Sequence, residues 1–325
     1  MRPSRCRLSL TALLLTAVPA AAQTAPTAAG GAFLLLPVGA RATALGQATA
    51  ADGGTSEALF WNPAGLAALA RSEFAIHHTT QFFGATDAVV IAVPSSSFGT
   101  FALAAYIVDY GDDQVTLPGG SDPVGTVTSR NVELLASYAT DVVGGLAAGI
   151  AYKLIQFRVD CSGDCANVPT ATGTTHAVDV GLRYVFPAFP LVIGAAVRNV
   201  GFKLQVNNQA QADPLPARLQ VGVSYGLRRP PTGVEGLDVR ILADVQGAVG
   251  QGTLSAVTLV GVESGVRDVV RIRGGYAFLD SEARGPSIGI GVAFGSVAFD
   301  IAKVFFANDD LGEKEPMHLS LRAMF

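Results

Sequence analysis

The sequence lacks the long apolar runs that membrane-spanning helices require. Such a helix needs about 18 or more consecutive apolar residues, and beyond roughly the first two dozen residues every apolar stretch is interrupted within about ten residues. Yet 50% of the chain is hydrophobic, only 15% is charged and the mean hydropathy is +0.40, which is apolar for a soluble protein. High average hydrophobicity without helix-length runs is typical of a membrane β-barrel.

Cysteine is scarce, with three residues in the chain. Cys6 lies in the N-terminal segment, whereas Cys161 and Cys165 have three residues between them in the stretch CSGDC. A zinc site needs four ligands, and no His or further Cys lies near in sequence; a redox motif would have two intervening residues. A disulfide closing a small loop is the favoured interpretation, and two free thiols are the alternative.

Motifs of enzymes and of nucleic-acid-binding proteins are also missing. The sequence has no G-x-S-x-G elbow, no H-E-x-x-H and no P-loop. Of the four histidines, the adjacent pair His77 and His78 would point to opposite faces of a strand and could not easily hold one metal ion. No basic run exists, and a net charge of −4 repels phosphates. We therefore expect a non-enzymatic protein without cofactor, metal or nucleic-acid partner.

The N-terminus carries an export signal. Arg2, Arg5 and Arg7 precede a short apolar run from Leu8 to Val18, and an A-x-A cleavage pattern ends at residue 22. A membrane-anchoring helix, the alternative, would need a longer apolar run. Residues 1–22 are predicted to be a signal peptide, and residues 23–71 a leader that precedes the folded barrel.

From about residue 72 the sequence becomes a succession of alternating segments. In LQVGVSYGL (219–227) large apolar residues occupy one face of a strand, and small or polar residues occupy the other. About fourteen such segments of bilayer-crossing length predict an all-β fold, a transmembrane antiparallel barrel spanning residues 72–325. The strands are expected near 73–79, 86–93, 99–108, 130–140, 146–158, 176–186, 191–200, 217–227, 237–246, 256–263, 268–278, 286–294, 296–306 and 317–325.

The connections alternate between long and short, as in outer-membrane barrels with both termini in the periplasm. Long loops are expected at 109–129, 159–176, 201–216 and 307–316, and tight turns at 141–145, 264–268 and 295–296. A soluble β-sandwich or lipocalin-like barrel would show the same alternation. The number of strands, the export signal and the small residues on the second face favour a barrel in the outer membrane of a Gram-negative-type envelope, in contact with outer-membrane lipid.

The leader contains a helix signal around the only Trp of the chain, Trp61. Asn62 is a favoured N-cap and Pro63 suits the first helical position. Leu66 and Leu69 form one apolar stripe on a short helix over about 63–70. A barrel of about fourteen strands would hold open water unless something filled it. Residues 30–70 are therefore predicted to plug the barrel; a periplasmic tail is the alternative.

The segment VGARATALGQATAADGGTSEALFWNPAGLAAL (38–69) resembles the N-terminal signature of the FadL superfamily and, within it, the PorV/PorQ family of outer-membrane barrels. The residues that match, which we call the plug motif, are Gly39, Arg41, Gly46, Trp61, Asn62, Pro63, Ala64 and Gly65. A second likeness, the strand-start motif, joins one strand end to the start of the next strand through Arg198, Asn199, Gly201, Pro214, Leu215 and Pro216. A D-L-G stretch at 310–312 resembles the closing loop of the family.

This resemblance implies two functions. PorV-type proteins act with the type IX secretion system and hold or shuttle secreted proteins at the cell surface without enzymatic activity, which is the favoured interpretation. FadL-type proteins are channels for hydrophobic small molecules, which is the alternative. Inward charges of mixed sign predict a salt-bridged lumen, and an arginine cluster that binds an anionic ligand is the other interpretation: Glu133, Lys153, Asp179, Arg183, Arg198, Arg240, Asp244, Arg271, Arg273, Asp300 and Arg322.

The loop pattern predicts which segments face the outside of the cell. An epitope tag inserted at Pro118-Gly119 should be reached by antibody on intact cells, whereas a tag at Gly144 should stay protected. Both tags should react once the envelope is permeabilised, which controls for expression. Equal accessibility of the two tags on intact cells would contradict the predicted topology.

Overall fold

The computed structural model describes residues 30–81, 83–116, 122–165, 170–205, 212–228, 236–250, 256–267, 269–278, 285–305 and 315–325. The predicted signal peptide, Cys6 and the D-L-G stretch at 310–312 lie outside the described residues. Among the residues that are described, no helix is both long and apolar enough to cross a membrane.

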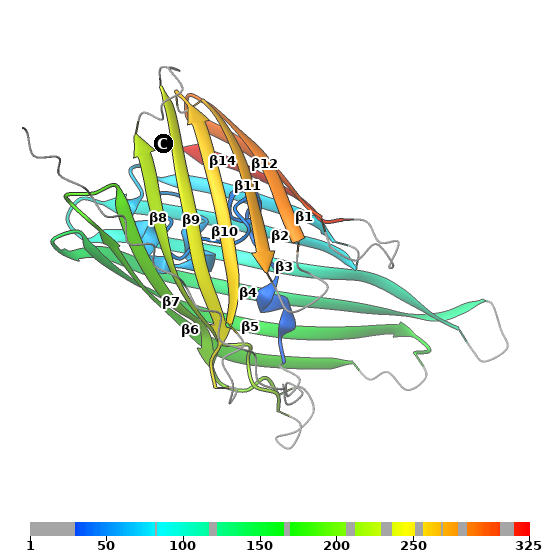
Figure 1. Ribbon diagram of the computed structural model, residues 1–325. Helices are drawn as coiled ribbons and strands as arrows, with labels where there is room; N and C mark the ends of the chain where they lie inside the picture. The colour runs from blue at the N-terminus through cyan, green and yellow to red at the C-terminus, as the bar shows by residue number, and fades with distance from the viewer. Residues whose placement is uncertain are drawn as a thin grey trace, which may run out of the picture.

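Fourteen antiparallel strands close into a barrel in which β1 pairs with both β2 and β14 (Figure 1). The predicted fold class is confirmed, and each expected segment overlaps one strand. The strands are β1 Glu73–Gln81, β2 Gly84–Ser95, β3 Gly99–Thr116, β4 Pro123–Val143, β5 Leu146–Gly163, β6 Ala171–Val185, β7 Leu191–Gly201, β8 Arg218–Arg228, β9 Leu237–Ala248, β10 Ala256–Val266, β11 Val270–Phe278, β12 Gly285–Phe294, β13 Val297–Val304 and β14 Met317–Met324.

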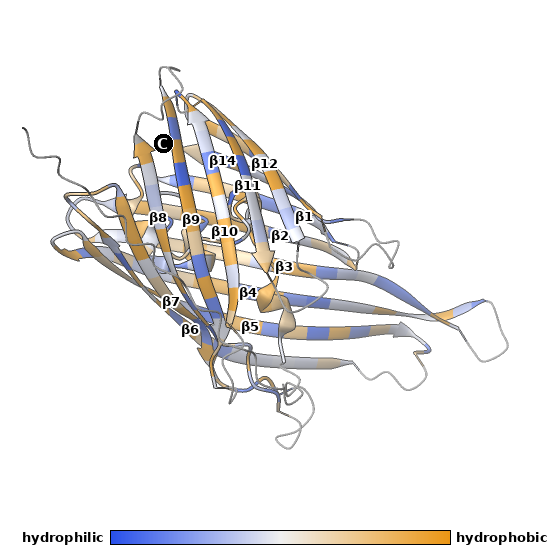
Figure 2. Ribbon diagram, viewed as in Figure 1, coloured by the Kyte–Doolittle hydropathy of each residue, from blue (hydrophilic) through white to orange (hydrophobic). Residues whose placement is uncertain are grey.

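The outer surface of the barrel is apolar, as a bilayer requires. On β12, Ile288, Ile290 and Val292 point outward with 55%, 50% and 45% of their surface exposed, while Gly289 and Gly291 between them are buried. Apolar positions recur on the exposed faces of neighbouring strands (Figure 2). A soluble sandwich or lipocalin-like barrel would bury this face instead, so the alternation indicates a membrane barrel.

Three strands are much longer than their apolar alternation predicts. β3, β4 and β5 continue past the rim of the barrel, at the right in Figure 1. The expected long loops 109–129 and 159–176 are therefore mostly paired strand: Asp112 pairs with Thr128, after a register shift that begins at Asp109. Backbone hydrogen bonds between polar residues extend a sheet without any apolar pattern. A disulfide joins Cys161 to Cys165, whose Cα atoms lie 6.1 Å apart, at the end of β5.

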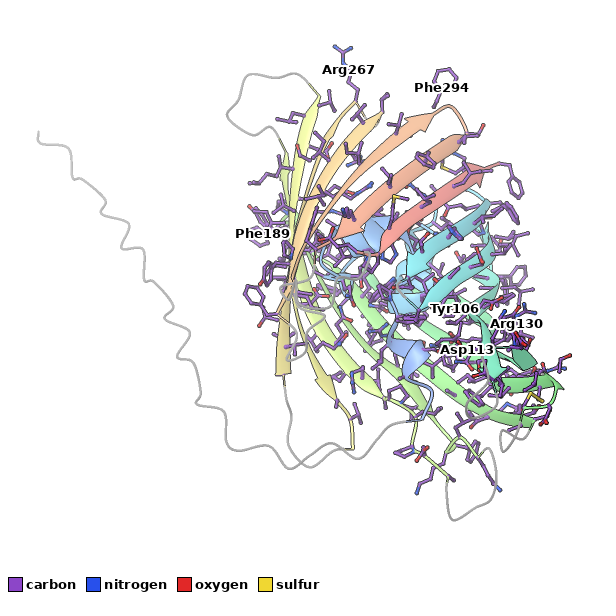
Figure 3. All side chains as sticks on the ribbon, turned by 90° about the vertical axis from the view of Figure 1, so that its right-hand side faces the viewer. Tyr106, Asp113, Arg130, Phe189, Arg267 and Phe294 are labelled. Atoms are coloured by element: carbon purple, nitrogen blue, oxygen red, sulfur yellow. A yellow bond between two sulfur atoms is a disulfide. The ribbon has the colours of Figure 1, made fainter. Side chains whose placement is uncertain are left out.

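The alternation of long and short connections is imperfect. We call the end of the barrel with the C-terminus the turn end and the opposite end the loop end; Figure 3 shows Arg267 and Phe294 at the turn end and Asp113 at the loop end. Only two residues join β1 to β2 at the loop end, where Gln81 pairs with Gly84. At the turn end, the connection from β8 to β9 is longer than a tight turn. The expectation of strict alternation is thus wrong at two connections.

Within the described residues 30–72, ahead of β1, four short helices form and pack in the barrel interior. The first two are the 3₁₀-helix η1 Ala32–Leu35 and α1 Ala40–Ala44, and the other two are α2 Ala58–Trp61 and the 3₁₀-helix η2 Pro63–Ala68. α1 packs against β11 to β14, whereas η2 packs against β3 to β6 on the other side of the bore. The residues between η1 and η2 thereby connect opposite walls. We call residues 30–70 the plug.

The helix expected over residues 63–70 is a 3₁₀-helix and ends at Ala68. Asn62 is its N-cap as predicted, and its side-chain oxygen accepts the Ala64 N–H at 3.1 Å. A separate α-helix precedes the cap, because Asn62 takes an extended conformation (φ −140°) that interrupts the helical path. The asparagine amide also donates to the carbonyl oxygens of Ala50 and of Leu182 on β6, at 2.5 and 3.0 Å. These bonds fix η2 against the wall.

Candidate functional site

The plug motif and the strand-start motif meet inside the barrel. Arg198 on β7 places its guanidinium carbon 4.9 Å from the centre of the Trp61 ring, and its Nη1 donates to the Phe60 carbonyl oxygen at 3.1 Å. Its Nη2 donates to the side-chain oxygens of Gln220 and Gln246 at 3.2 and 3.1 Å. A desolvated cation over an indole face stabilises by about 2 kcal/mol. Arg198 therefore fastens the plug to the wall.

Asn199 forms a β-bulge directly after Arg198. Two residues of β7 lie opposite Asp179 of β6, and Asn199 adopts a positive φ of 59°, which asparagine tolerates. Its N–H donates to the Asp179 carboxylate at 2.7 Å, and the Lys153 ammonium donates to its side-chain oxygen at 2.8 Å. Lys153 also pairs with Glu133 and Asp179 at 3.0 and 2.9 Å. Inward charges thus fix the bulge that aims Arg198 at the plug.

The proline-rich part of the strand-start motif connects this bulge to the beginning of the plug. The Pro214 carbonyl oxygen accepts the Gly30 N–H at 3.0 Å, and the Pro216 carbonyl oxygen accepts the Asn199 amide at 3.4 Å. Leu215 is 8% exposed and packs in the same apolar cluster as the plug. The short segment 214–216 therefore contacts both the beginning of the plug at Gly30 and the bulge at Asn199.

The glycines of the two motifs allow backbones to approach closely. Gly46 has a φ of 61°, and a Cβ on it would lie 2.6 Å from backbone atoms of both Val260 and Tyr276. A Cβ on Gly65 would lie 2.7 Å from a plug carbonyl oxygen, and one on Gly201 would strike the neighbouring strand β6. Side chains at these positions would hold the backbones apart.

Inward-facing glycines of the wall do the same from the other side of the interface. A Cβ on any of six wall glycines would collide with plug atoms, most of them backbone: Gly149, Gly181, Gly194, Gly261, Gly275 and Gly289. The plug residues they receive include Pro63 and Ala64, which lie on Gly149 of β5. The sequence indicated a face of small residues, but it did not show which of its glycines would contact the plug.

Arg41 of the plug belongs to a buried ion network at the turn end. It pairs with Asp52 of the plug, and its Nε donates to Glu263 on β10 at 3.2 Å. Arg240 on β9 bridges the same two carboxylates at 2.8 Å each. Burial alone would raise the pKa of Asp52, but the guanidinium groups of Arg240 and Arg41 lower it to about 2. The plug is therefore ionically tied to β9 and β10.

Glu57 is a buried plug carboxyl that sequence reasoning missed. Its Oε2 accepts the Ala42 N–H at 3.0 Å, whereas its Oε1 has no hydrogen-bond partner among the described residues. Burial raises the pKa of Glu57 to about 7, although Arg322 acts to lower it. A Cβ on Gly39, whose φ is 94°, would strike this side chain. Glu57 thus links α2 to the start of α1.

The histidine pair splits as predicted. His77 is buried inside the barrel with its Nδ1 2.8 Å from the Ser320 hydroxyl, and His78 faces outward with its Nδ1 2.8 Å from Asp87. Within the described ranges, no group of three or more His, Cys, Asp or Glu side chains is placed to hold a metal ion.

Toward the loop end the interior is apolar and aromatic. Tyr106 on β3 is 2% exposed and lies edge-on to Phe60 of the plug, with 6.3 Å between ring centres; Figure 3 shows Tyr106 inside the barrel. Phe83 and Tyr110 form a second ring pair at 5.2 Å, nearer the loops. Both pairs belong to or pack against one buried cluster that continues to Trp61. The aromatic rings thus lie toward the loop end and the Arg41 network toward the turn end, while the ion pairs of Lys153 lie beside Tyr106, opposite which Glu133 is paired.

Replacing Gly275 with valine should displace the plug from the wall. A Cβ there would strike the Gly46 backbone, whereas at Gly274, which faces outward, the nearest atom is a Ser287 oxygen at 3.9 Å. Overpacking of this kind costs about 1–3 kcal/mol. We expect Gly275→Val to raise conductance in planar bilayers and Gly274→Val to keep the wild-type value. Wild-type conductance in both variants would show that this plug contact does not occlude the barrel.

No family model matches the chain, and no curated protein matches its sequence. Solved structures do match its fold. The Ralstonia pickettii toluene transporter TbuX is 14% identical with a TM-score of 0.60, over 88% of this chain and 98% of that one. The monoaromatic hydrocarbon channel CymD is 12% identical with a TM-score of 0.59, over 89% and 97%. A Pseudomonas aeruginosa FadL homologue is 12% identical with a TM-score of 0.54, over 89% and 99%. The chain thus has the fold of these proteins over nearly its whole length.

Proposed function

We propose that this chain is an outer-membrane channel for hydrophobic small molecules, closed by its plug and without enzymatic activity. Export by residues 1–22 and loops facing the outside of the cell belong to the same proposal. The fold that it shares with a toluene transporter and a monoaromatic hydrocarbon channel supports this function over protein secretion. The apolar outer surface supports outer-membrane lipid as its surroundings.

The observation that carries the proposal is the aromatic cluster inside the loop end. Phe83 and Tyr110 are only partly buried, so their rings are in reach of a molecule that enters between the loops. Tyr106 and Phe60 continue the aromatic surface inward to the plug. A hydrophobic solute gains about 25 cal/mol for each Å² of its apolar surface that it removes from water. This surface would draw such a solute from the outside of the cell to the plug.

Passage beyond the aromatic cluster requires the plug to move. Several of the contacts that hold the plug are side-chain contacts that a shift can break and remake, among them Arg198 over Trp61, the Asn62 amide on the wall, and Arg41 with Glu263. It has no long helix of its own that would have to unfold. A small displacement of the residues between η1 and η2 would therefore open a route to the turn end.

A charge in the aromatic cluster should block uptake. We expect Tyr110→Asp to lower toluene uptake by cells that depend on this protein by about tenfold or more, because desolvating an ion costs several kcal/mol. Phe98→Asp, the matched control, makes a similar change at an exposed turn-end residue, 71% exposed, and should leave uptake unchanged. Surface immunoblots would equalise protein levels. Equal uptake by both variants, or wild-type uptake no greater than in cells without the protein, would contradict the channel.

Protein docking is the second candidate function, favoured by the polar sheet that β3, β4 and β5 extend past the rim. Arg130 pairs there with Asp109 at 3.0 Å, and the Thr128 hydroxyl donates to Asp112 at 2.5 Å. The disulfide lies in the same sheet. Such an ordered polar surface suits a protein partner, either a secreted protein or a component of a secretion system.

Purification from native membranes should separate the two functions. Mass spectrometry of the proteins and lipids that accompany the barrel should find a hydrophobic molecule and no stoichiometric protein if it is a channel. Asp112 and Thr128 are paired neighbours in the sheet, so deleting residues 112–128 rejoins chain ends that lie side by side. This deletion should then leave toluene uptake intact. A protein that co-purifies with wild type and is lost with this deletion would instead assign the docking function.

A further inference from the structure

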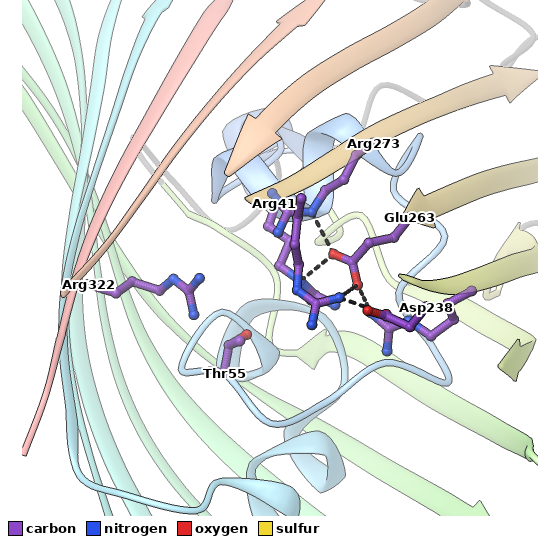
Figure 4. A pocket seen from close by; sticks show the side chains of 8 residues that line it. Arg41, Thr55, Asp238, Glu263, Arg273 and Arg322 are labelled. Atoms are coloured by element: carbon purple, nitrogen blue, oxygen red, sulfur yellow. Dashed lines mark hydrogen bonds and ion pairs between the residues drawn. The ribbon is translucent and has the colours of Figure 1, made fainter. Parts of the chain in front are cut away.

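A cavity of about 350 Å³ at the turn end is lined mainly by guanidinium groups. Figure 4 shows Arg322 on one side of it and Arg41 and Arg273 on the other, with Thr55 of the plug between them. The volume is that of a small-ligand pocket, which is typically about 300–1,000 Å³. The arginines that line it come from the plug, β9, β11 and β14: Arg41, Arg240, Arg271, Arg273 and Arg322.

The exposure of these side chains gives the cavity a floor and a mouth. At the floor, the side chains of Arg273 and Glu263 are 2% and 3% exposed. Toward the mouth, the side chains of Arg271 and Asp238 are 25% and 44% exposed. A solute at the turn end can therefore enter the cavity from water. The inner part of the cavity is largely shielded from water. Electrostatic attraction strengthens in such surroundings.

Positive charge faces the cavity, and most of the negative charge lies behind it. Glu263 and Asp238 are the two carboxylates of the lining. Three more compensate the arginines from outside the lining: Asp52 pairs with Arg240, and Asp300 and Glu73 pair with Arg322. The lining itself therefore carries five guanidinium groups against two carboxylates. Planar guanidinium forks match carboxylate and phosphate oxygens.

Arg322 lines the cavity with a guanidinium group whose hydrogen bonding is incomplete. The residue is 9% exposed, and its Nε has no hydrogen-bond partner among the described residues although its terminal nitrogens are paired. A buried donor without a partner is costly, so native proteins rarely leave one. The Nε atom itself is shielded from the cavity, so an anion there would act on Arg322 through the charge of its guanidinium group.

We propose that this cavity binds the carboxylate or phosphate group of a small solute at the turn end, which the proposed topology places in the periplasm. Arg271 and Arg240 would meet the anion at the mouth, Arg322 and Arg41 would hold it inside, and the Thr55 hydroxyl would donate a further hydrogen bond. The site is distinct from the aromatic cluster, which lies at the other end of the barrel. Its ligand is recognised by charge, whereas the channel substrate is recognised by apolar surface.

Isothermal titration calorimetry on the full-length protein in detergent and a chloride-free buffer tests this site. The probes are inorganic phosphate, benzoate and toluene. We expect one anion to bind per barrel, with benzoate stronger if the natural solute is a carboxylate and phosphate stronger if it is phosphorylated. Either result supports the site. Absence of binding by both anions, or toluene binding that depends on the same arginines, would overturn it.

Variants show whether the arginines are responsible. Arg271→Gln and Arg322→Gln should each weaken anion binding about tenfold or more, since a charge-assisted hydrogen bond is lost. Arg130→Gln, an exposed arginine beyond the opposite rim, is the matched control and should bind as wild type. Asp238→Asn removes a negative charge at the mouth and should tighten binding, which tests the site even if the arginine variants fail to fold. Unchanged binding in Arg271→Gln and Asp238→Asn together would overturn the proposal.

The readout separates this site from the channel. Toluene uptake measured in the same variants reports on the aromatic cluster and the plug, whereas calorimetry reports on the arginines alone. Anion binding without toluene uptake would leave the site intact and overturn the proposed function. Uptake without anion binding would overturn only the site.

Discussion

The bore of a barrel of fourteen strands is too wide for its own side chains to fill, and the structure depends on filling it with a second layer of backbone. Backbone that enters a protein interior must find hydrogen-bond partners there. The wall supplies them: the Ala40 N–H donates to the Ser320 hydroxyl at 2.8 Å, and the Ala50 N–H donates to Asp244 at 2.7 Å. The wall glycines make such short distances possible. Packing backbone inside the barrel therefore requires an inner face that is polar and also made of small residues.

The two ends of the interior on either side of this filling differ in the side chains that gather there. Aromatic rings lie on the loop side of the plug, and a network of arginines and carboxylates lies on the turn side. Trp61 and Arg198 stand at the boundary, where an aromatic ring and a cation are in direct contact. A solute that crosses the barrel would leave an environment that rewards apolar surface and enter one that rewards charge. A protein with a single uniform lumen would not impose this sequence of environments.

The sequence predicts the membrane-embedded part of the strands well, because alternation between lipid and lumen leaves a period-two pattern in the residues. It does not predict the extensions of β3 to β5, since polar residues such as Asp112 and Thr128 pair through backbone groups that carry no pattern. The cap at Asn62 follows from local chemistry and was predictable, but the separate helix before it was not. The contact between Arg198 and Trp61 joins two motifs that sequence alone places in different elements.

The candidate site shows the same limit. Inward arginines were predictable one strand at a time, because each strand fixes which of its residues face the lumen. Their convergence on Glu263 depends on strand order and register around the closed barrel, which no single segment encodes. Glu57 gave no signal, because a plug glutamate next to an apolar run looks like an ordinary solvated residue. Its burial follows only from the barrel that surrounds it.

Trp61 is the only tryptophan of the chain, and it lies in the plug with its ring under the Arg198 guanidinium and its Nε1 donating to the Val38 carbonyl oxygen at 3.0 Å. The ring is buried, so it would become exposed to water if the plug left the wall. The protein therefore carries a built-in optical reporter. Excited at the long-wavelength edge of its absorption, where the seven tyrosines of the strands absorb little, its emission would report on the plug without any label.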